Sequence, residues 1–192
     1  MQPSQPKDKG HPQTQQQVSH PTWVKHHKKR NAAITAIIVS VLVIVIVIAS
    51  LPSSNVKAGQ RAPDFTIQSI NGKSFQLYAQ TTSVFMEFMR TTCSHCQNEA
   101  PSLTTLYSQY GSRVVFVSIS IGLGDTPSMI QSFAAQYNQT WTFALDTSGL
   151  TQTYGVQGTP TIFVLDKSHV VQNIFAGETS LSTLQDALNG VA

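Results

Sequence analysis

Cysteine and charged side chains are both scarce in this chain of 192 residues, which contains two cysteines and 11% charged residues. A pair of cysteines separated by two residues supplies only half of a structural zinc site, which needs two further ligands. The histidines that could supply them in the part expected to fold are His95 and His169. The composition therefore disfavours a zinc site.

Acidic residues are nearly missing from the beginning of the chain. Residues 1–31 contain six lysines or arginines and a single acid, Asp8, which gives a net charge of +5. Residues 52–192 contain six lysines or arginines and eight acids, which gives a net charge of −2. Because the basic character belongs to the N-terminal part, the charge pattern argues against nucleic-acid binding by the folded part.

Large apolar side chains are almost absent from residues 1–22, which are rich in glutamine, proline, lysine and histidine. A segment of this composition cannot bury enough apolar surface to fold, so we expect it to be disordered. The nearby histidines, His11, His20, His26 and His27, are irregularly spaced and have no cysteine or acidic cluster beside them. They indicate a solvated tail more than a metal site.

Charge is completely missing from residues 32–51, AAITAIIVSVLVIVIVIASL. A helix of that length spans about 30 Å, the thickness of the hydrocarbon core of a bilayer. The basic cluster at residues 25–30 precedes it, and the positive-inside rule places such a cluster in the cytoplasm. We therefore predict a cytoplasmic basic arm over 1–31, a single transmembrane helix over 32–51, a linker over 52–58 and an extracytoplasmic domain over 59–192.

A cleaved signal peptide is the alternative for this segment. Signal peptides also begin with basic residues, and Val47-Ile48-Ala49 could serve as a cleavage site. Their apolar region is normally about 7–15 residues, which is shorter than the run seen here. The sequence thus favours an uncleaved anchor in the cell membrane.

The remainder of the chain has the pattern of an α/β domain. Asn71-Gly72 separates two short runs at 65–70 and 73–77 and predicts a β-hairpin. Further strands are expected at 84–89, 114–121 and 141–146, and a second hairpin at 161–166 and 170–175. Helices are expected at 96–110, 126–137, 150–154 and 181–189. Strands that alternate with helices and end in a hairpin predict a mixed sheet covered by helices.

The two cysteines lie three positions apart, as Cys93-Ser94-His95-Cys96, directly after the expected strand at 84–89. A disulfide between them would close a very short loop and would remove little entropy from the unfolded chain. Such a pair therefore suits reversible redox exchange better than structural stabilisation. A stable disulfide is the alternative.

Three residues of this turn have an expected role. Cys93 falls at the N-terminus of the following helix, where unpaired N–H groups favour the thiolate, so we expect it to be the attacking nucleophile. Cys96, one turn inside, would be the less exposed, resolving thiol. A protonated His95 near the thiolate would stabilise the reduced form and make the pair more oxidising.

The expected strand, cysteine pair and helix at 84–110, followed about sixty residues later by the segment Gly155–Thr161, resemble the thioredoxin superfamily. The closest resemblance is to its membrane-anchored, extracytoplasmic TlpA/ResA-like branch, supported by the segment Gly59–Phe65 and by Glu99-Ala100-Pro101. The likeness covers about residues 57–192. It implies a thioredoxin-like mixed sheet flanked by helices with an N-terminal hairpin, and an exchange of disulfides with partner proteins that needs no cofactor.

The resemblance also implies roles for residues outside the cysteine turn. Pro160 would be a cis-proline facing the disulfide, and the backbone of Thr159 would pair with an extended substrate segment. Glu87, six residues before Cys93, matches a buried acid that moves the proton of the second cysteine. The alternatives are a trans proline at an edge strand and a surface glutamate. Glu99 could also approach the thiols from the helix, but the expectation for it is a solvated position.

The chain departs from the family pattern just before the first cysteine. Thr92 stands where an aromatic residue is usual, and Arg90-Thr91-Thr92 replaces the commoner Trp-Ala-x-Trp type of sequence. Arg90 either adds positive potential near Cys93 or is a solvated loop charge.

The sequence thus predicts a membrane-anchored, extracytoplasmic thiol–disulfide oxidoreductase, which a membrane-embedded redox partner could recycle. One alternative is a copper metallochaperone that uses Cys93, Cys96 and His169, although that family favours three residues between its cysteines. Another is a peroxiredoxin-type peroxidase, although Arg90 stands where its motif has threonine. A purely structural ectodomain would tolerate loss of Cys93. The direction of electron flow is left open.

Overall fold

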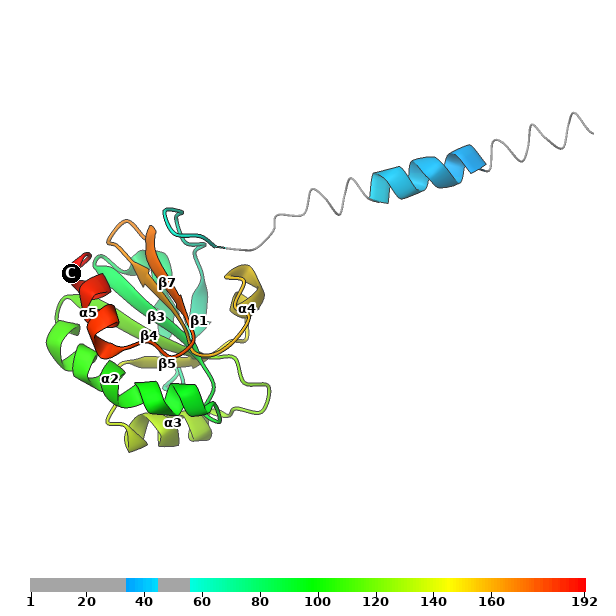
Figure 1. The fold of residues 1–192 in the computed structure, drawn as a ribbon. Coiled ribbons are helices and arrows are strands. Elements are labelled where there is room, and N and C mark those ends of the chain that lie inside the picture. Colours follow the sequence, from blue (N-terminus) through cyan, green and yellow to red (C-terminus); the bar gives the residue numbers. More distant parts are fainter. Residues whose placement is uncertain (1–33, 45–55) are drawn as a thin grey trace, which may run out of the picture. The chain divides into compact units, whose positions relative to one another are not determined.

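The computed structural model describes residues 34–44 and 56–192, and we treat these two parts separately (Figure 1). Residues 34–44 form a helix whose side chains are exposed. Within the described residues, no helix is both long and apolar enough to cross a membrane. The predicted anchor over 32–51 extends beyond the described helix at both ends, and the predicted arm over 1–31 lies outside the described residues.

The second part contains a five-stranded mixed sheet in the order β5-β4-β3-β6-β7. Its strands are β3 (Ser83–Met89), β4 (Val114–Ser120), β5 (Thr142–Leu145), β6 (Thr161–Leu165) and β7 (Val171–Ala176). The central strand β3 runs parallel to β4 and antiparallel to β6, and β4 runs parallel to β5. The predicted α/β fold with a mixed sheet and a closing hairpin is confirmed.

The predicted N-terminal hairpin is also present, as β1 (Thr66–Gln68) and β2 (Ser74–Gln76), followed by the 3₁₀ turn η1 (Leu77–Ala79). Gly72 adopts a positive φ of 76° in the turn, a conformation that glycine reaches without a steric penalty. The N–H of Ile70 donates to the Phe143 carbonyl at 2.8 Å and ties the hairpin to the sheet.

Four helices flank the sheet, and two of them begin directly after capping residues that the sequence shows. They are α2 (Ser94–Tyr110), α3 (Pro127–Gln136), α4 (Leu150–Thr153) and α5 (Leu181–Asn189). The hydroxyl of Thr126 accepts a hydrogen bond from the N–H of Met129 at α3, and that of Ser180 accepts one from Thr183 at α5. Helix α2 begins two residues earlier than predicted, directly after Cys93.

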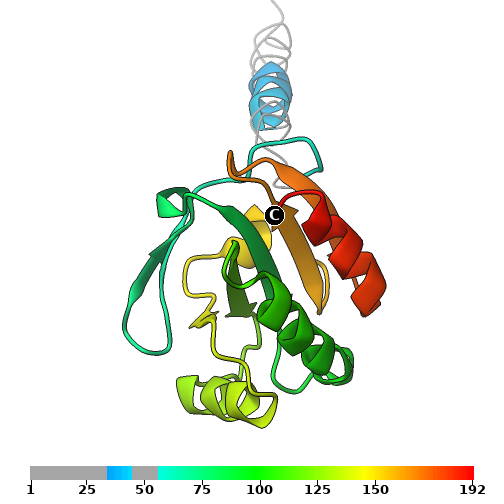
Figure 2. The ribbon, with the colours of Figure 1, turned by 90° about the vertical axis from the view of Figure 1, so that its left-hand side faces the viewer.

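The two faces of the sheet are covered by different elements. Along β3, Val84, Met86 and Phe88 pack against the hairpin and α4, whereas Phe85 points to the opposite face, covered by α2, α3 and α5. Figures 1 and 2 show α2 and α5 side by side on that face. Glu87 is two residues after Phe85 on the same strand, so it lies on the same face, which α2 covers.

The segment that enters the domain runs beside the start of β7. Val56, within the predicted linker, packs against the core beneath the hairpin. The N–H of Gly59 donates to the Val171 carbonyl at 2.7 Å, and the N–H of Ala62 donates to the His169 carbonyl at 2.8 Å. His169 thus belongs to the end of the sheet where the chain enters.

Candidate active site

Cys93 is the N-cap residue of α2, at the point where the chain leaves the central strand β3. Its Sγ accepts a hydrogen bond from the N–H of Cys96 at 3.3 Å. Both cysteines are free thiols; Cys93 is half-buried and Cys96 is fully buried. The predicted position of Cys93 at a helix N-terminus and the lower exposure of Cys96 are therefore confirmed.

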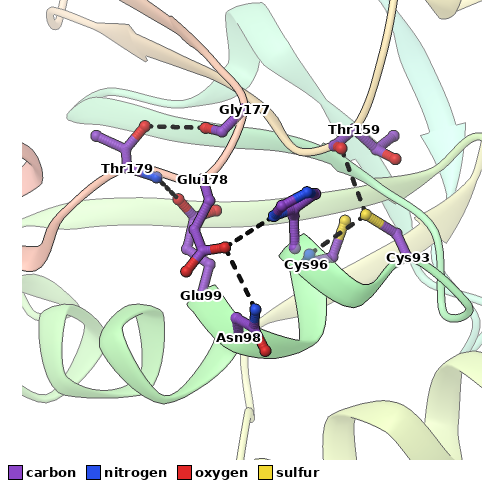
Figure 3. Close-up of polar contacts among 9 residues, drawn as sticks. Cys93, Cys96, Asn98, Glu99, Thr159, Gly177, Glu178 and Thr179 are labelled. Atoms are coloured by element: carbon purple, nitrogen blue, oxygen red, sulfur yellow. Dashed lines mark hydrogen bonds and ion pairs between the residues drawn. The ribbon is translucent and has the colours of Figure 1, made fainter.

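A cis peptide bond joins Thr159 to Pro160 in the loop before β6. The thiol of Cys93 donates a hydrogen bond to the Thr159 carbonyl at 3.3 Å, so this loop lies directly against the cysteine turn (Figure 3). The predicted cis form is confirmed and the trans alternative is wrong.

The surroundings of Cys93 favour its thiolate. Burial raises the pKa of Cys93, but hydrogen bonds from the Cys96 thiol, from the Thr159 side chain and from the N–H groups of Cys96 and His95 outweigh burial and lower it below the ordinary value. A thiol with a lowered pKa is a stronger nucleophile at neutral pH because more of it is ionised. The geometry thus gives Cys93 the properties of the attacking thiol.

Cys96 has the opposite properties. Burial raises the pKa of Cys96, and so do the hydrogen bond to Cys93 and the negative charge of Glu87, although a backbone hydrogen bond from Arg90 opposes them. Cys96 therefore remains protonated at neutral pH.

Glu87 is fully buried in the middle of β3, opposite Ser118 on β4 and Ile162 on β6. Burial raises the pKa of Glu87 to about 7, while the hydrogen bond from the Ser118 hydroxyl, 2.6 Å from Oε2, lowers it. The alternative of a surface glutamate is wrong. A carboxyl that titrates near neutrality can both accept and release a proton there.

Glu99 is 2% exposed, so the expectation of a solvated helix residue is wrong. It lies three positions after Cys96 on the helix face that is buried with Ala100. Its Oε1 accepts a hydrogen bond from the N–H of Thr179 at 2.7 Å, whereas its Oε2 has no partner among the described residues (Figure 3). Burial raises the pKa of Glu99 to about 8. The spacing from Cys96 places Glu99 on the same side of α2 as the buried thiol, but its burial also depends on the distant loop that carries Thr179.

His95 points toward the loop between β7 and α5. Its Nδ1 lies 2.9 Å from Oε2 of Glu178, and the amide of Asn98 lies 3.4 Å from the same oxygen (Figure 3). The side chains of His95 and Glu178 are 65% and 41% exposed. Redox tuning by His95 stays a prediction, and the structure adds a carboxylate as its partner.

The loop before Cys93 is held by Asp125, a residue that sequence reasoning missed. The N–H and hydroxyl of Thr91 donate to Asp125 at 3.0 and 2.6 Å, and the hydroxyl of Ser120 donates to it as well. Arg90 is exposed, and its Nε donates to the Thr159 hydroxyl at 3.2 Å. Arg90 and Thr91, which replace residues of the usual family pattern, therefore hold this loop through polar contacts with Thr159 and Asp125.

The residues of the copper alternative do not come together. His169 lies in the β6–β7 turn, where its Nε2 is 3.1 Å from the Gln80 carbonyl. Because β6 runs antiparallel to β3, this turn lies beside the beginning of β3, at the opposite end from Cys93. In residues 34–44 and 56–192, no group of three or more histidine, cysteine or acidic side chains could hold a metal ion.

Comparison with known proteins agrees with this geometry. Residues 58–174 match the model of the AhpC/TSA family. The chain belongs to the AhpC/TSA family. It is 30% identical to the thiol-disulfide oxidoreductase ResA of Bacillus thuringiensis subsp. konkukian over 138 residues, which cover 71% of this chain and 79% of that protein. It is 26% identical to the thioredoxin-like protein YneN of Bacillus subtilis over 136 residues, 70% of this chain and 80% of that protein.

The fold is shared with solved structures of the superfamily. A secreted Mycobacterium tuberculosis disulfide oxidoreductase homologous to E. coli DsbE superimposes with a TM-score of 0.58 at 24% identity, covering 66% of this chain and 96% of that one. The predicted membership of the thioredoxin superfamily is confirmed, and this AhpC/TSA member is a homologue of ResA-type thiol–disulfide oxidoreductases with a close Cys93–Cys96 pair.

Proposed function

We propose that this protein is a membrane-tethered, extracytoplasmic thiol–disulfide oxidoreductase that exchanges disulfides with partner proteins. One observation carries the proposal. The sulfur of Cys93 contacts both the N–H of Cys96 and the carbonyl of Thr159 beside the cis-proline, so the nucleophile, the resolving residue and a substrate-docking backbone meet at one point.

The reaction begins when the Cys93 thiolate attacks one sulfur of a partner disulfide. A bond forms between Cys93 and the partner, and the other partner sulfur leaves as a thiolate and takes up a proton. The Cys96 thiol then passes its proton to the carboxylate of Glu87, and the Cys96 thiolate attacks Cys93. The Cys93–Cys96 disulfide forms, the second partner thiolate leaves, and two electrons have passed to the partner. The same steps in reverse oxidise a partner dithiol.

Substrate docking involves Thr159 and Pro160. In the dithiol state the Thr159 carbonyl accepts the proton of Cys93. Ionisation of Cys93 removes this donor, so the carbonyl becomes able to accept a backbone N–H from an extended partner segment. Pro160 has no N–H and therefore does not compete for that partner.

The proposed tether is supported by the sequence. The uncharged run at 32–51 and the basic cluster before it predict an anchor with the domain outside the cytoplasm. Confinement to one surface would raise the effective concentration of a membrane-embedded redox partner.

The experiment that tests the function uses the full-length chain in detergent. We expect Cys96→Ser to accumulate mixed disulfides with a model protein substrate, visible as reducible adducts by mass spectrometry. Cys93→Ser should form none. Equilibration in glutathione buffers gives the direction of electron flow: about −120 mV marks a strong oxidant and about −270 mV a thioredoxin-like reductant.

Three results would contradict the proposal. Rapid turnover of hydrogen peroxide without protein disulfide exchange would favour the peroxidase alternative. Stoichiometric Cu(I) binding that is lost on His169→Ala would favour the copper alternative. Full function of Cys93→Ser would indicate a structural ectodomain.

A further inference from the structure

A buried chain of hydrogen bonds ends at Glu87. The indole Nε1 of Trp141 donates to the hydroxyl oxygen of Ser118 at 2.9 Å, and the hydroxyl of Ser118 donates to Oε2 of Glu87 at 2.6 Å. Ser118 is 1% exposed and Glu87 is 2% exposed, so solvent does not replace these contacts. Such a chain of donors is expected to act as a unit in a medium of low polarity.

The second hydrogen bond runs from Ser118 to Glu87 because an ionised carboxylate can only accept, and the first bond favours this arrangement. An indole N–H can only donate, so it occupies a lone pair of the Ser118 hydroxyl. A hydroxyl has a single proton, and with Trp141 as the donor to its oxygen, that proton is free to point toward Glu87. Trp141 thereby orients Ser118 as a donor to the carboxylate.

The sheet register brings the three residues together. Glu87 and Ser118 are direct partners on the parallel strands β3 and β4, and both point to the face that α2 covers. Trp141, just before β5, is packed on the same face against the rings of Tyr107 and Phe116. The indole is therefore fixed by packing that does not involve its N–H.

The other groups near Glu87 do not replace Ser118. From α2, the ionisable groups that interact with its charge are Cys96 and Glu99, and negative charge on either would oppose ionisation of Glu87. From β6, the residue opposite Glu87 is the apolar Ile162. Phe133 of α3, which packs with Cys96, is also apolar. Ser118 is thus the side-chain donor to Glu87 among the described residues.

We infer that Ser118, oriented by Trp141, is a positioning residue that favours the ionised form of Glu87 and so maintains the base for Cys96. This inference rests on the proposed function for the role of Glu87, but the hydrogen-bond chain can be tested without it. A hydrogen bond to a charged carboxylate stabilises that form more than the protonated one. Loss of the donor would leave Glu87 protonated, and unable to accept a proton, over a wider range of pH.

The test compares the wild-type full-length chain with Ser118→Ala, Ser118→Thr, Trp141→Phe and, as a matched packing control, Phe143→Leu. Phe143 stacks on Trp141 at 5.6 Å and contributes a ring but no hydrogen bond to the chain. The first readout is the infrared carboxyl stretch of Glu87 against pH, assigned by its loss in Glu87→Gln. The second is a single turnover with a chromogenic aromatic disulfide, in which attack by Cys93 and resolution by Cys96 each release one thiolate.

We expect Ser118→Ala to move the infrared titration of Glu87 to higher pH. The resolving step should slow roughly fivefold at pH 7, the effect of a rise of about one pH unit on a carboxyl that is half ionised there, and recover near pH 9. Trp141→Phe should act in the same direction with a smaller effect, because Ser118 keeps its hydroxyl but loses its orientation. Ser118→Thr should retain most of the wild-type titration, and Phe143→Leu should leave it in place.

An unchanged infrared titration in folded Ser118→Ala would overturn the inference, whatever the kinetics. The same shift in Phe143→Leu would overturn it too, because packing alone would then explain the change. A shifted titration without a change in the resolving step would support the role of Ser118 and contradict the proposed role of Glu87. Thermal unfolding of each variant confirms that a folded protein is compared.

Discussion

Nδ1 of His95 lies 2.9 Å from Oε2 of Glu178, so the histidine within the cysteine turn is paired with a carboxylate from the loop between β7 and α5. A positive charge on His95 is therefore partly neutralised before it acts on Cys93. Both side chains are also well exposed, and water and salt screen such charges. The oxidising effect that the sequence suggests for His95 should accordingly be small.

The first prediction concerns His95→Gln. We expect the rate of Cys93 alkylation at pH 7 to change by less than about threefold, because the paired and screened charge contributes little to the thiolate. Iodoacetamide labelling against pH measures this rate. Glu178→Gln is the matched variant on the other side of the pair. A loss of more than about tenfold in His95→Gln would show that the histidine controls the thiolate directly.

The second prediction concerns the order in which the two thiols react. At neutral pH in the folded protein, Cys93 should be alkylated at least roughly tenfold faster than Cys96, because its pKa is lowered and Cys96 is buried with a raised pKa. Peptide mapping by mass spectrometry after a short pulse separates the two sites. In denaturant the two rates should become similar. Equal rates in the folded protein would contradict the assignment of the nucleophile.

The third prediction concerns stability against pH. The pKa of Glu87 is raised from 4.5 to about 7 in the folded protein, so between these values the folded state binds more protons than the unfolded state. Stability contributed by this group is therefore present below about pH 4.5 and is lost as the pH rises to about 7. The loss corresponds to about 3 kcal/mol in the free energy of unfolding. Glu87→Gln should remove this part of the pH dependence.

Urea unfolding of the full-length chain at pH 5 and pH 8 measures the difference. Glu178→Gln is the control, since Glu178 is a partly exposed carboxyl whose pKa is lowered by its hydrogen bonds to His95 and Asn98. The same pH dependence in Glu87→Gln and in the wild type would mean that Glu87 is not the titrating group.

The fourth prediction concerns Asp125→Ala. This change would remove the acceptor for the N–H and hydroxyl of Thr91 and for the hydroxyl of Ser120. We expect destabilisation of about 1–3 kcal/mol and slower attack by Cys93, because the preceding loop would lose its anchor. Thermal unfolding and alkylation rates check both effects. Asp125→Asn, which keeps an acceptor oxygen, should be milder, and equal effects of the two variants would point to charge rather than hydrogen bonding.

Features that depend on neighbours in sequence were predictable. The hairpin at Asn71-Gly72, the capping residues Thr126 and Ser180, and the cysteine turn each follow from local geometry, and each is present. The cis bond before Pro160 required the resemblance to the superfamily, because an isolated Thr-Pro pair does not specify its isomer.

Features that depend on distant neighbours were not predictable from one sequence. Glu99 reads as an ordinary helix residue until the loop carrying Thr179, eighty positions later, covers it. Asp125 and Thr91 are 34 residues apart, and Ser118 and Trp141 are 23 apart. In each case the sheet topology creates the contact, and the residue types alone do not reveal it.

The attachment of the Thr91 loop to Asp125 has a consequence for engineering. Hydrogen bonds from Thr91 to Asp125, rather than the packing of a large aromatic ring, hold the residues that precede Cys93. A lead-in of the Trp-Ala-x-Trp type in place of Arg90-Thr91-Thr92 would remove the Thr91 hydroxyl that donates to the Asp125 carboxylate. Exchange of the redox turn between this protein and its relatives should therefore succeed only when the β4–α3 loop is moved with it.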